Sequence, residues 1–333
     1  MLPPLVESLG LTDPGVYVCL FLAASLLMVW RLEAMLDHGL EGTALGTLVM
    51  PYCSGLGNLL FVGIVARRDG PAGEVLTNAL VNNVTNVTLL LGVPALVWGL
   101  SLAAPKSAGG KKARGGGDAV AARLSRLSLL LSLAAALFFA GAAWLLTDDG
   151  RLSRTDGALL VGLFLFWQTF QLVDVLKHNV RRNAGFGFLF YVDLLLVLAC
   201  AWLVYETLDW LVAWLSAQRG GFFRAENLGW LTGWLMVLPN ALLALYWAAK
   251  RRADVCYASQ VGDGHICVPL CLGFLGLLSP VAVPAFFREG LVLFGGAVVV
   301  HALLLLAFGG LPRWAGAGLV GAYGWFLWRG WGG

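Results

Sequence analysis

Ten stretches of predominantly apolar residues follow one another along this sequence, and each is long enough to cross a lipid bilayer as a helix. The hydrocarbon core of a bilayer is about 30 Å thick, and an α-helix needs about 20 apolar residues to span it. The stretches are approximately 15–34, 43–66, 74–102, 127–146, 157–176, 186–209, 227–249, 254–280, 290–309 and 314–331. The sequence therefore predicts an all-α polytopic membrane protein with about ten transmembrane helices.

Composition excludes a soluble protein of this length. Hydrophobic residues make up 59% of the 333 residues and charged residues 12%, and the mean hydropathy is +0.80. Soluble domains average about 45–50% apolar and about 25% charged residues. No basic region precedes the first apolar stretch, so we expect this stretch to be a retained helix and not a cleaved signal peptide.

The sequence shows none of the residue patterns that membrane enzymes use. It contains no HExxH motif, His pair or acidic cluster, so no enzymatic activity and no cofactor are expected. The cysteines are scattered in apolar stretches without paired loop spacing, which predicts neither a disulfide framework nor a zinc site. They are Cys19, Cys53, Cys200, Cys256, Cys267 and Cys271.

Lysine and arginine are unevenly distributed between the connections of the apolar stretches. The connections after the third, fifth, seventh and ninth stretches hold Lys106, Lys111, Lys112, Arg114, Arg123, Arg126, Lys177, Arg181, Arg182, Lys250, Arg251, Arg252 and Arg313. The opposite side holds fewer, namely Arg67, Arg68, Arg151, Arg154, Arg219, Arg224, Arg288 and Arg329. By the positive-inside rule, we expect both termini to lie outside the cytoplasm, in a multi-pass protein of the bacterial inner (plasma) membrane.

The longest connection, 103–126, contains the segment "SAGGKKARGGGD" and is expected to lie in the cytoplasm. Its Gly and Lys content is typical of a flexible linker, and no binding of nucleic acid is expected. The expected partners are membrane lipid and small inorganic cations, while the oligomeric state stays open.

The two halves of the chain resemble each other. "PYCSGLGNLLFVG" is followed by "TNALVNNVTNVTLLLG" in the first half, and "GWLMVLPNALLAL" by "ASQVGDGHICVPLCLG" in the second. Asn58 precedes Gly92 by 34 residues, and Asn240 precedes Gly273 by 33. Since five spans insert the second half upside down, we predict two inverted five-helix repeats, 1–180 and 181–333, with the similar segments at about 43–102 and 227–280.

Each repeat carries a polar stripe within an apolar helix. Asn78, Asn82 and Asn86 are four residues apart and therefore share one helix face. The corresponding residues of the second half are Ser259, Asp263 and Cys267. We expect the two stripes to face each other, with Asn58 and Asn240 between them. Such residues can serve only as hydrogen-bonding contacts between helices, but an oxygen-rich cluster at membrane depth also suits hard cations.

The spacing resembles the α-repeats of the sodium/calcium exchanger superfamily, whose motifs read "GTSLPE" on one helix and "GNxxGSNxxNxxLxLG" on the next. In the first half, the matching residues are "CSGLGN" at 53–58, Asn78, Asn83, Asn86, Leu91 and Gly92. In the second half, they are "MVLPN" at 236–240, Gly262, Leu272 and Gly273. The resemblance implies a secondary cation antiporter that works by alternating access, with the four repeat helices holding the ion and the first and sixth helices sliding.

The departures from these motifs bear on the ion. The resemblance places an acid at the positions of Asn58 and Asn240, and Ser at the position of Asp263. The Thr-Ser pair of the motif is replaced by "SG" at 54–55 and by "MV" at 236–237. The candidate cation ligands are Ser54, Asn58, Asn82, Asn86, Asn240, Asp263 and Cys267.

One carboxylate balances one positive charge, and a buried ion without compensating charge costs several kcal/mol. We therefore expect a monovalent transported cation, Na⁺ first, with K⁺ or H⁺ possible. Two alternatives stay open: a Na⁺/Ca²⁺ or other Ca²⁺ antiporter, and a non-transporting exchanger-fold protein with a structural or sensory role.

Further ionisable residues lie within the apolar stretches. Asp193 and Glu206 occur in the sixth stretch, and Asp193 is the alternative that could complete a divalent site. Arg31 and Glu33 are two residues apart, so each is expected to reach the interface or a separate partner. His265 is either a pH-sensitive group beside Asp263 or a neutral residue bonded to a backbone carbonyl. Gly262, Gly264 and Pro269 predict a bend in this helix that exposes backbone carbonyls.

Overall fold

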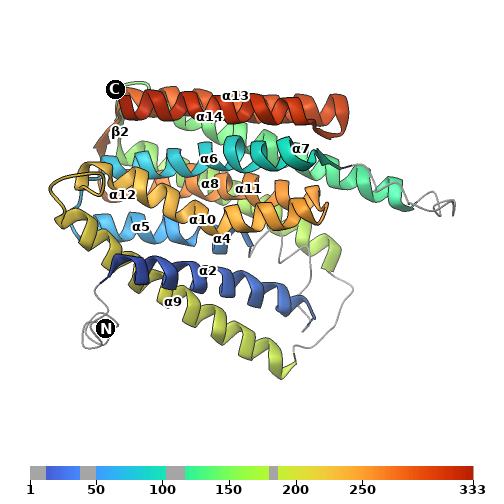
Figure 1. Cartoon of the computed structure of the whole chain (residues 1–333), viewed down its shortest axis with the longest axis horizontal. Helices are drawn as coiled ribbons and strands as arrows, with labels where there is room; N and C mark the ends of the chain where they lie inside the picture. Colours follow the sequence, from blue (N-terminus) through green and yellow to red (C-terminus); the bar gives the residue numbers. More distant parts are fainter. Residues whose placement is uncertain (1–12, 38–49, 103–116, 180–186, 333) are drawn as a thin grey trace. The chain divides into compact units, whose positions relative to one another are not determined.

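The computed structural model describes residues 13–37, 50–102, 117–179 and 187–332, and these are almost entirely helical (Figure 1). The helices are α2 (Pro14–Asp37), α4 (Met50–Ser54), α5 (Leu56–Arg67), α6 (Gly73–Trp98), α7 (Gly117–Leu146), α8 (Arg154–Asn179), α9 (Phe188–Ala217), η2 (Ala225–Asn227), α10 (Leu228–Ala249), α11 (Ala253–Ile266), the π-helical turn η3 (Cys267–Cys271), α12 (Leu272–Leu278), α13 (Ala285–Phe308) and α14 (Arg313–Gly332). Four two-residue strands are β1 (Leu100–Ser101), β2 (Arg151–Leu152), β3 (Val281–Ala282) and β4 (Gly310–Leu311).

Every predicted apolar stretch overlaps helix in the part that the structure describes, and the all-α membrane fold is confirmed. Eight helices in the described part of the chain are long and apolar enough to cross a membrane. The count of ten is not confirmed by this criterion, because α5 has only 12 residues and α14 is not in this set.

The second predicted stretch, 43–66, is wrong as a single helix. Residues 43–49 lie outside the described part, and the remainder is divided at Gly55 into α4 and α5. Ser54 therefore ends one helix, and Asn58 lies in the first turn of the next.

The chain packs into two compact units, each containing segments from both halves of the sequence. Unit 1 consists of Met1–Asn82, Thr147–Pro239 and Ile266–Pro284. Unit 2 consists of Asn83–Leu146, Asn240–His265 and Ala285–Gly333. The predicted boundary between the sequence repeats, 180/181, falls outside the described residues and stays a prediction.

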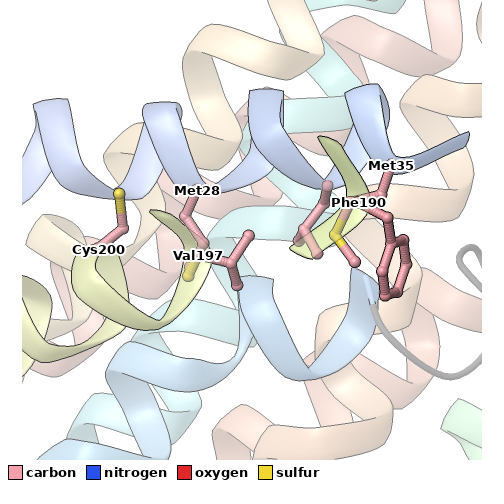
Figure 2. Packing of buried hydrophobic residues seen from close by; sticks show 6 residues of the cluster. Met28, Met35, Phe190, Val197 and Cys200 are labelled. Atoms are coloured by element: carbon pink, nitrogen blue, oxygen red, sulfur yellow. The ribbon is translucent and has the colours of Figure 1, made fainter. Parts of the chain in front are cut away.

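In unit 1, α2 lies along α9 (Figure 1). Figure 2 shows side chains of both helices pointing toward one another; the buried cluster is Met28, Leu32, Met35, Phe190, Val197 and Cys200. Tyr17 stacks on Trp210 with ring centroids 3.7 Å apart. Arg31 Nη1 lies 3.4 Å from Asp193 Oδ1, so the separate partner expected for Arg31 is an acid on α9. Apolar packing, ring stacking and an ion pair thus hold this helix pair together.

Close backbone contacts recur at equivalent positions of the two sequence repeats. In unit 1, a Cβ on Gly157 of α8 would lie 2.6 Å from the carbonyl oxygen of Gly273. In unit 2, a Cβ on Gly316 of α14 would lie 2.6 Å from the carbonyl oxygen of Gly92. Gly92 and Gly273 are the equivalent glycines of the two repeats, and each packs against the fifth helix of the other repeat. This exchanged packing supports the predicted internal repeat.

Each strand pair also joins a segment of the first sequence repeat to a segment of the second. Within unit 2, β1 lies at the end of the third predicted stretch and pairs with β4, which follows the ninth. Within unit 1, β2 follows the fourth and pairs with β3, which follows the eighth. An even number of predicted stretches lies between the members of each pair, as is required if both members are on one side of a membrane.

Four polar contacts also join segments that are expected on the same side of the membrane. Those between segments expected outside the cytoplasm join Arg68 Nη2 to Asp209 Oδ2 at 2.8 Å, Gly229 N to Glu74 Oε2 at 2.6 Å and Arg329 Nη2 to Glu289 Oε1 at 2.7 Å. On the expected inner side, Arg251 Nη1 donates to the carbonyl oxygen of Trp98 at 3.0 Å. None of these four contacts joins segments expected on opposite sides.

Candidate functional site

Three of the four asparagines of α6 donate amide protons to side chains of other helical segments. Asn78 Nδ2 donates to Thr232 Oγ1 at 3.0 Å, and Asn82 Nδ2 donates to Cys267 Sγ at 3.3 Å, both within unit 1. Asn86 Nδ2 donates to Asp263 Oδ2 at 2.8 Å within unit 2. An amide whose N–H groups are used in this way presents its carbonyl oxygen, which is the atom a hard cation binds.

Asp263 lies at the centre of the polar residues of unit 2. Its side chain is fully buried, and its Oδ2 accepts from Asn86 Nδ2 and also from Asn240 Nδ2, at 3.4 Å. The structure therefore brings together three of the seven predicted ligands. Asn86 Oδ1 is buried and has no hydrogen-bond partner among the described residues.

A glycine allows α11 to approach α6 at this point. A Cβ on Gly264 would lie 3.0 Å from Asn83 Oδ1 and 3.3 Å from Phe294 Cζ. A Cβ on Gly262, two residues earlier, would have no atom of a neighbouring segment within 4 Å. The contact between Asp263 and Asn86 thus requires a small residue at 264 but not at 262.

The other four predicted ligands belong to unit 1. Asn82 contacts Cys267, as noted above, whereas Ser54 is half-buried at the end of α4. Asn58 is 1% exposed, and neither its Oδ1 nor its Nδ2 has a hydrogen-bond partner among the described residues. Gly57 beside it packs on Met236, since a Cβ on Gly57 would lie 3.3 Å from Met236 Cγ. Asn58 is thus buried near α10 without a hydrogen bond to Asn82 or Cys267.

The predicted bend of the eighth stretch is a π-helical turn. It spans Cys267–Cys271 and contains Pro269, which has no N–H to donate to the preceding turn. The helix thus continues on both sides of the turn, as α11 and α12, and is not broken at Gly262 or Gly264.

His265 and Asp193 each contact another helix, through a hydrogen bond and an ion pair respectively. His265 Nε2 lies 2.8 Å from the carbonyl oxygen of Ser132, so the nitrogen donates and the bonding to a backbone carbonyl expected as one alternative is observed. Asp193 is 2% exposed and is paired with Arg31 within unit 1, so its charge is already balanced. Glu206 is partly buried, and its role stays open.

Gln260 was not among the predicted ligands. Its side chain is 1% exposed in unit 2, and its Nε2 donates to the Asn240 carbonyl oxygen at 3.3 Å and to Ser259 Oγ at 2.9 Å. The signal was present, because Gln260 precedes Asp263 by three residues and so shares its helix face. Among the described residues, no group of three or more His, Cys, Asp or Glu side chains could hold a metal ion. Neutral oxygens therefore accompany a single carboxylate at this position.

Comparison with known proteins bears on the family and the fold of the chain. Residues 15–173 match the family model described as sodium/calcium exchanger protein. No significant match exists among curated proteins.

Solved structures of the sodium-calcium exchanger NCX_Mj have a similar fold. One, soaked with 10 mM Na⁺ and 10 mM Sr²⁺, is 17% identical with a TM-score of 0.65, over 93% of this chain and 96% of that chain. Another, soaked with zero Na⁺ and Ca²⁺, is 15% identical with a TM-score of 0.61, over 93% and 94%. At this level of identity, the likeness establishes a shared fold.

Proposed function

This chain is a member of the sodium/calcium exchanger superfamily, as its repeats predict, and from this premise we propose that it is a secondary active cation antiporter working by alternating access. We expect the transported cation to be monovalent, with Na⁺ as the first expectation and K⁺ or H⁺ as the alternatives. The protein is an integral, multi-pass membrane protein. Its placement in a bacterial inner membrane, with both termini outside the cytoplasm, is part of the proposal.

The observation that carries the proposal is the environment of Asp263. A fully buried carboxylate accepts hydrogen bonds from two asparagine amides, and the Oδ1 atom of one of them, Asn86, is buried without a hydrogen-bond partner among the described residues. Desolvating an ion in a low-dielectric interior requires compensating charge, and one carboxylate compensates one charge. Amide oxygens replace water ligands without adding charge. This set supports binding of a dehydrated monovalent cation in preference to a divalent one.

Antiport follows when two ion species compete for the same oxygens. A ligand shifts a conformational equilibrium only through its different affinity for the two states. If the site is stable in an occluded form only when loaded, then the unloaded protein does not reorient, and each ion leaves in exchange for another.

Flux into proteoliposomes containing the purified protein tests this function. Outward gradients of Na⁺, K⁺, Li⁺ and Ca²⁺ are compared across a pH series, with protein-free liposomes as control. We expect Na⁺-dependent exchange against a second monovalent ion. Absence of gradient-driven exchange with every ion, in protein that remains folded, would favour the structural or sensory alternative.

A Ca²⁺ antiporter is the second candidate, because the family model is that of sodium/calcium exchangers. It differs in charge requirement, since Ca²⁺ sites gain affinity from additional carboxylates. Ca²⁺ uptake driven by Na⁺ in the unmodified protein would establish it and exclude the monovalent assignment.

A further inference from the structure

The side-chain amide of Gln260 is held by hydrogen bonds from its nitrogen, whereas its oxygen accepts none from the described residues. The Nε2 group donates to two acceptors, the Asn240 carbonyl oxygen and Ser259 Oγ. The Oε1 atom is buried and has no hydrogen-bond partner among the described residues. A buried polar atom without a partner is unfavourable, and in native proteins it requires an explanation such as a bound water, an ion or a functional role.

The position of Gln260 relates this oxygen to Asp263. The two residues lie three apart on α11, so their side chains project from neighbouring positions of one helix face. Asn240 connects them, since its carbonyl oxygen accepts from Gln260 and its Nδ2 donates to Asp263. All of these contacts lie within unit 2.

Asn86 Oδ1 is in the same condition as Gln260 Oε1. Its amide nitrogen is used by Asp263, while the oxygen is buried and has no partner among the described residues. The residues around Asp263 thus offer two amide oxygens, each on a side chain whose orientation is fixed through its nitrogen.

We propose that Gln260 is a ligand of the transported alkali cation and determines its selectivity, with Oε1 completing the oxygens of Asp263 and Asn86. This inference rests on the proposed cation transport. Because two hydrogen bonds restrain the Gln260 amide, its oxygen adjusts little to ions of different size. Restrained oxygens at a set spacing are one way in which proteins discriminate Na⁺ from the larger K⁺.

The experiment measures ion-dependent thermal stability and ion binding by titration calorimetry in detergent, with Na⁺ and K⁺ replacing choline at constant ionic strength. Gln260→Leu should lower the Na⁺ affinity by about tenfold or more and reduce the preference for Na⁺ over K⁺. Gln260→Asn retracts the oxygen by one methylene and serves if the leucine variant does not fold; it should weaken Na⁺ binding in the same direction.

Tyr257→Phe is the matched control on the same helix. The Tyr257 hydroxyl bonds to His301 Nδ1 at 3.2 Å, so this variant loses a buried contact between helices but no proposed ligand. A ligand role predicts unchanged Na⁺ affinity in Tyr257→Phe and reduced affinity in Gln260→Leu. A purely structural role predicts lower stability of both variants with unaltered ion affinity and selectivity, and this result overturns the inference.

Asp263→Asn separates this inference from the function on which it rests. Loss of Na⁺ binding in Asp263→Asn together with wild-type affinity in folded Gln260→Leu leaves the transporter proposal standing and refutes the role of Gln260. Absence of ion binding in the unmodified protein refutes both.

Discussion

Asp263 Oδ2 accepts a hydrogen bond from Asn86 Nδ2 at 2.8 Å, although the two residues are 177 positions apart in the sequence. One belongs to the first sequence repeat and the other to the second. Both side chains are fully buried, so the bond joins the two repeats in a place without solvent. The first prediction concerns the strength of this bond.

Asn86→Leu should destabilise the folded protein by about 2 kcal/mol, because hydrogen bonds to charged groups contribute about 1.5–3 kcal/mol and the carboxylate would remain buried with one donor fewer. Unfolding in mixed detergent, followed by circular dichroism, measures the change. The double variant Asn86→Leu with Asp263→Leu should recover much of the loss, because both polar partners are then removed. A double variant less stable than the single one would contradict this account.

The second prediction uses the two glycines that flank Asp263. Gly264→Ala should weaken Na⁺ binding, because its Cβ would lie 3.0 Å from Asn83 Oδ1 and would push α11 away from α6. Gly262→Ala has open space at its Cβ and should retain ion binding, with stability raised by up to about 1 kcal/mol from the higher helix propensity of alanine. Thermal stability and calorimetric affinity are measured for both. Equal effects of the two substitutions would refute the close approach at Gly264.

The third prediction concerns the charge of the transported ion. The Asn58→Glu, Asn240→Glu double variant restores acids where the family motif has them, and should shift binding from Na⁺ toward Ca²⁺ because two more carboxylates balance a divalent charge. Titration calorimetry with both ions measures the shift. The matched control is Asn227→Glu, at a residue whose amide bonds to the carbonyl oxygen of Phe222. Ca²⁺ affinity that stays unchanged in the double variant would argue that these positions do not face the ion.

The fold class was predictable because each membrane-spanning helix requires a run of about 20 apolar residues, which is visible in the hydropathy of the sequence. Each long helix in the described part overlaps one predicted apolar stretch, and the exception is the interruption at Gly55. The stretch "PYCSGLGNLLF" stays apolar through that interruption, so hydropathy gives no sign of it. Breaks of this kind depend on local backbone geometry, which a composition window does not resolve.

The candidate site was predictable to the extent that helix periodicity determines it. Asn78, Asn82 and Asn86 lie in one helix at the predicted spacing, and each donates a hydrogen bond to another helical segment. The partners of Gln260 and Arg31 were not predictable, because they lie on helices 20 and 162 residues away and depend on how those helices rotate. Whether these residues bind a cation stays a prediction.

The fourth prediction concerns topology. A small epitope tag inserted between Lys106 and Arg114 should be protected in intact cells, and tags at either terminus should be accessible, because the basic connections are retained in the cytoplasm. Accessibility to a membrane-impermeant antibody, before and after permeabilisation, measures this. Labelling of the 106–114 tag in intact cells would show that the predicted orientation in the membrane is reversed. The contacts between segments on the same side of the membrane would be consistent with either orientation.

The most direct test of the central claim is Na⁺-driven flux through Asp263→Asn in proteoliposomes. The substitution keeps the size of the side chain and removes the only carboxylate in the two repeat stripes. We predict that flux falls by at least about 100-fold, equivalent to about 2.7 kcal/mol, while the purified protein stays folded and monodisperse. Asp263→Glu, which retains the charge, should keep a measurable part of the activity. Wild-type flux in Asp263→Asn would contradict the account and would place the ion elsewhere in the protein.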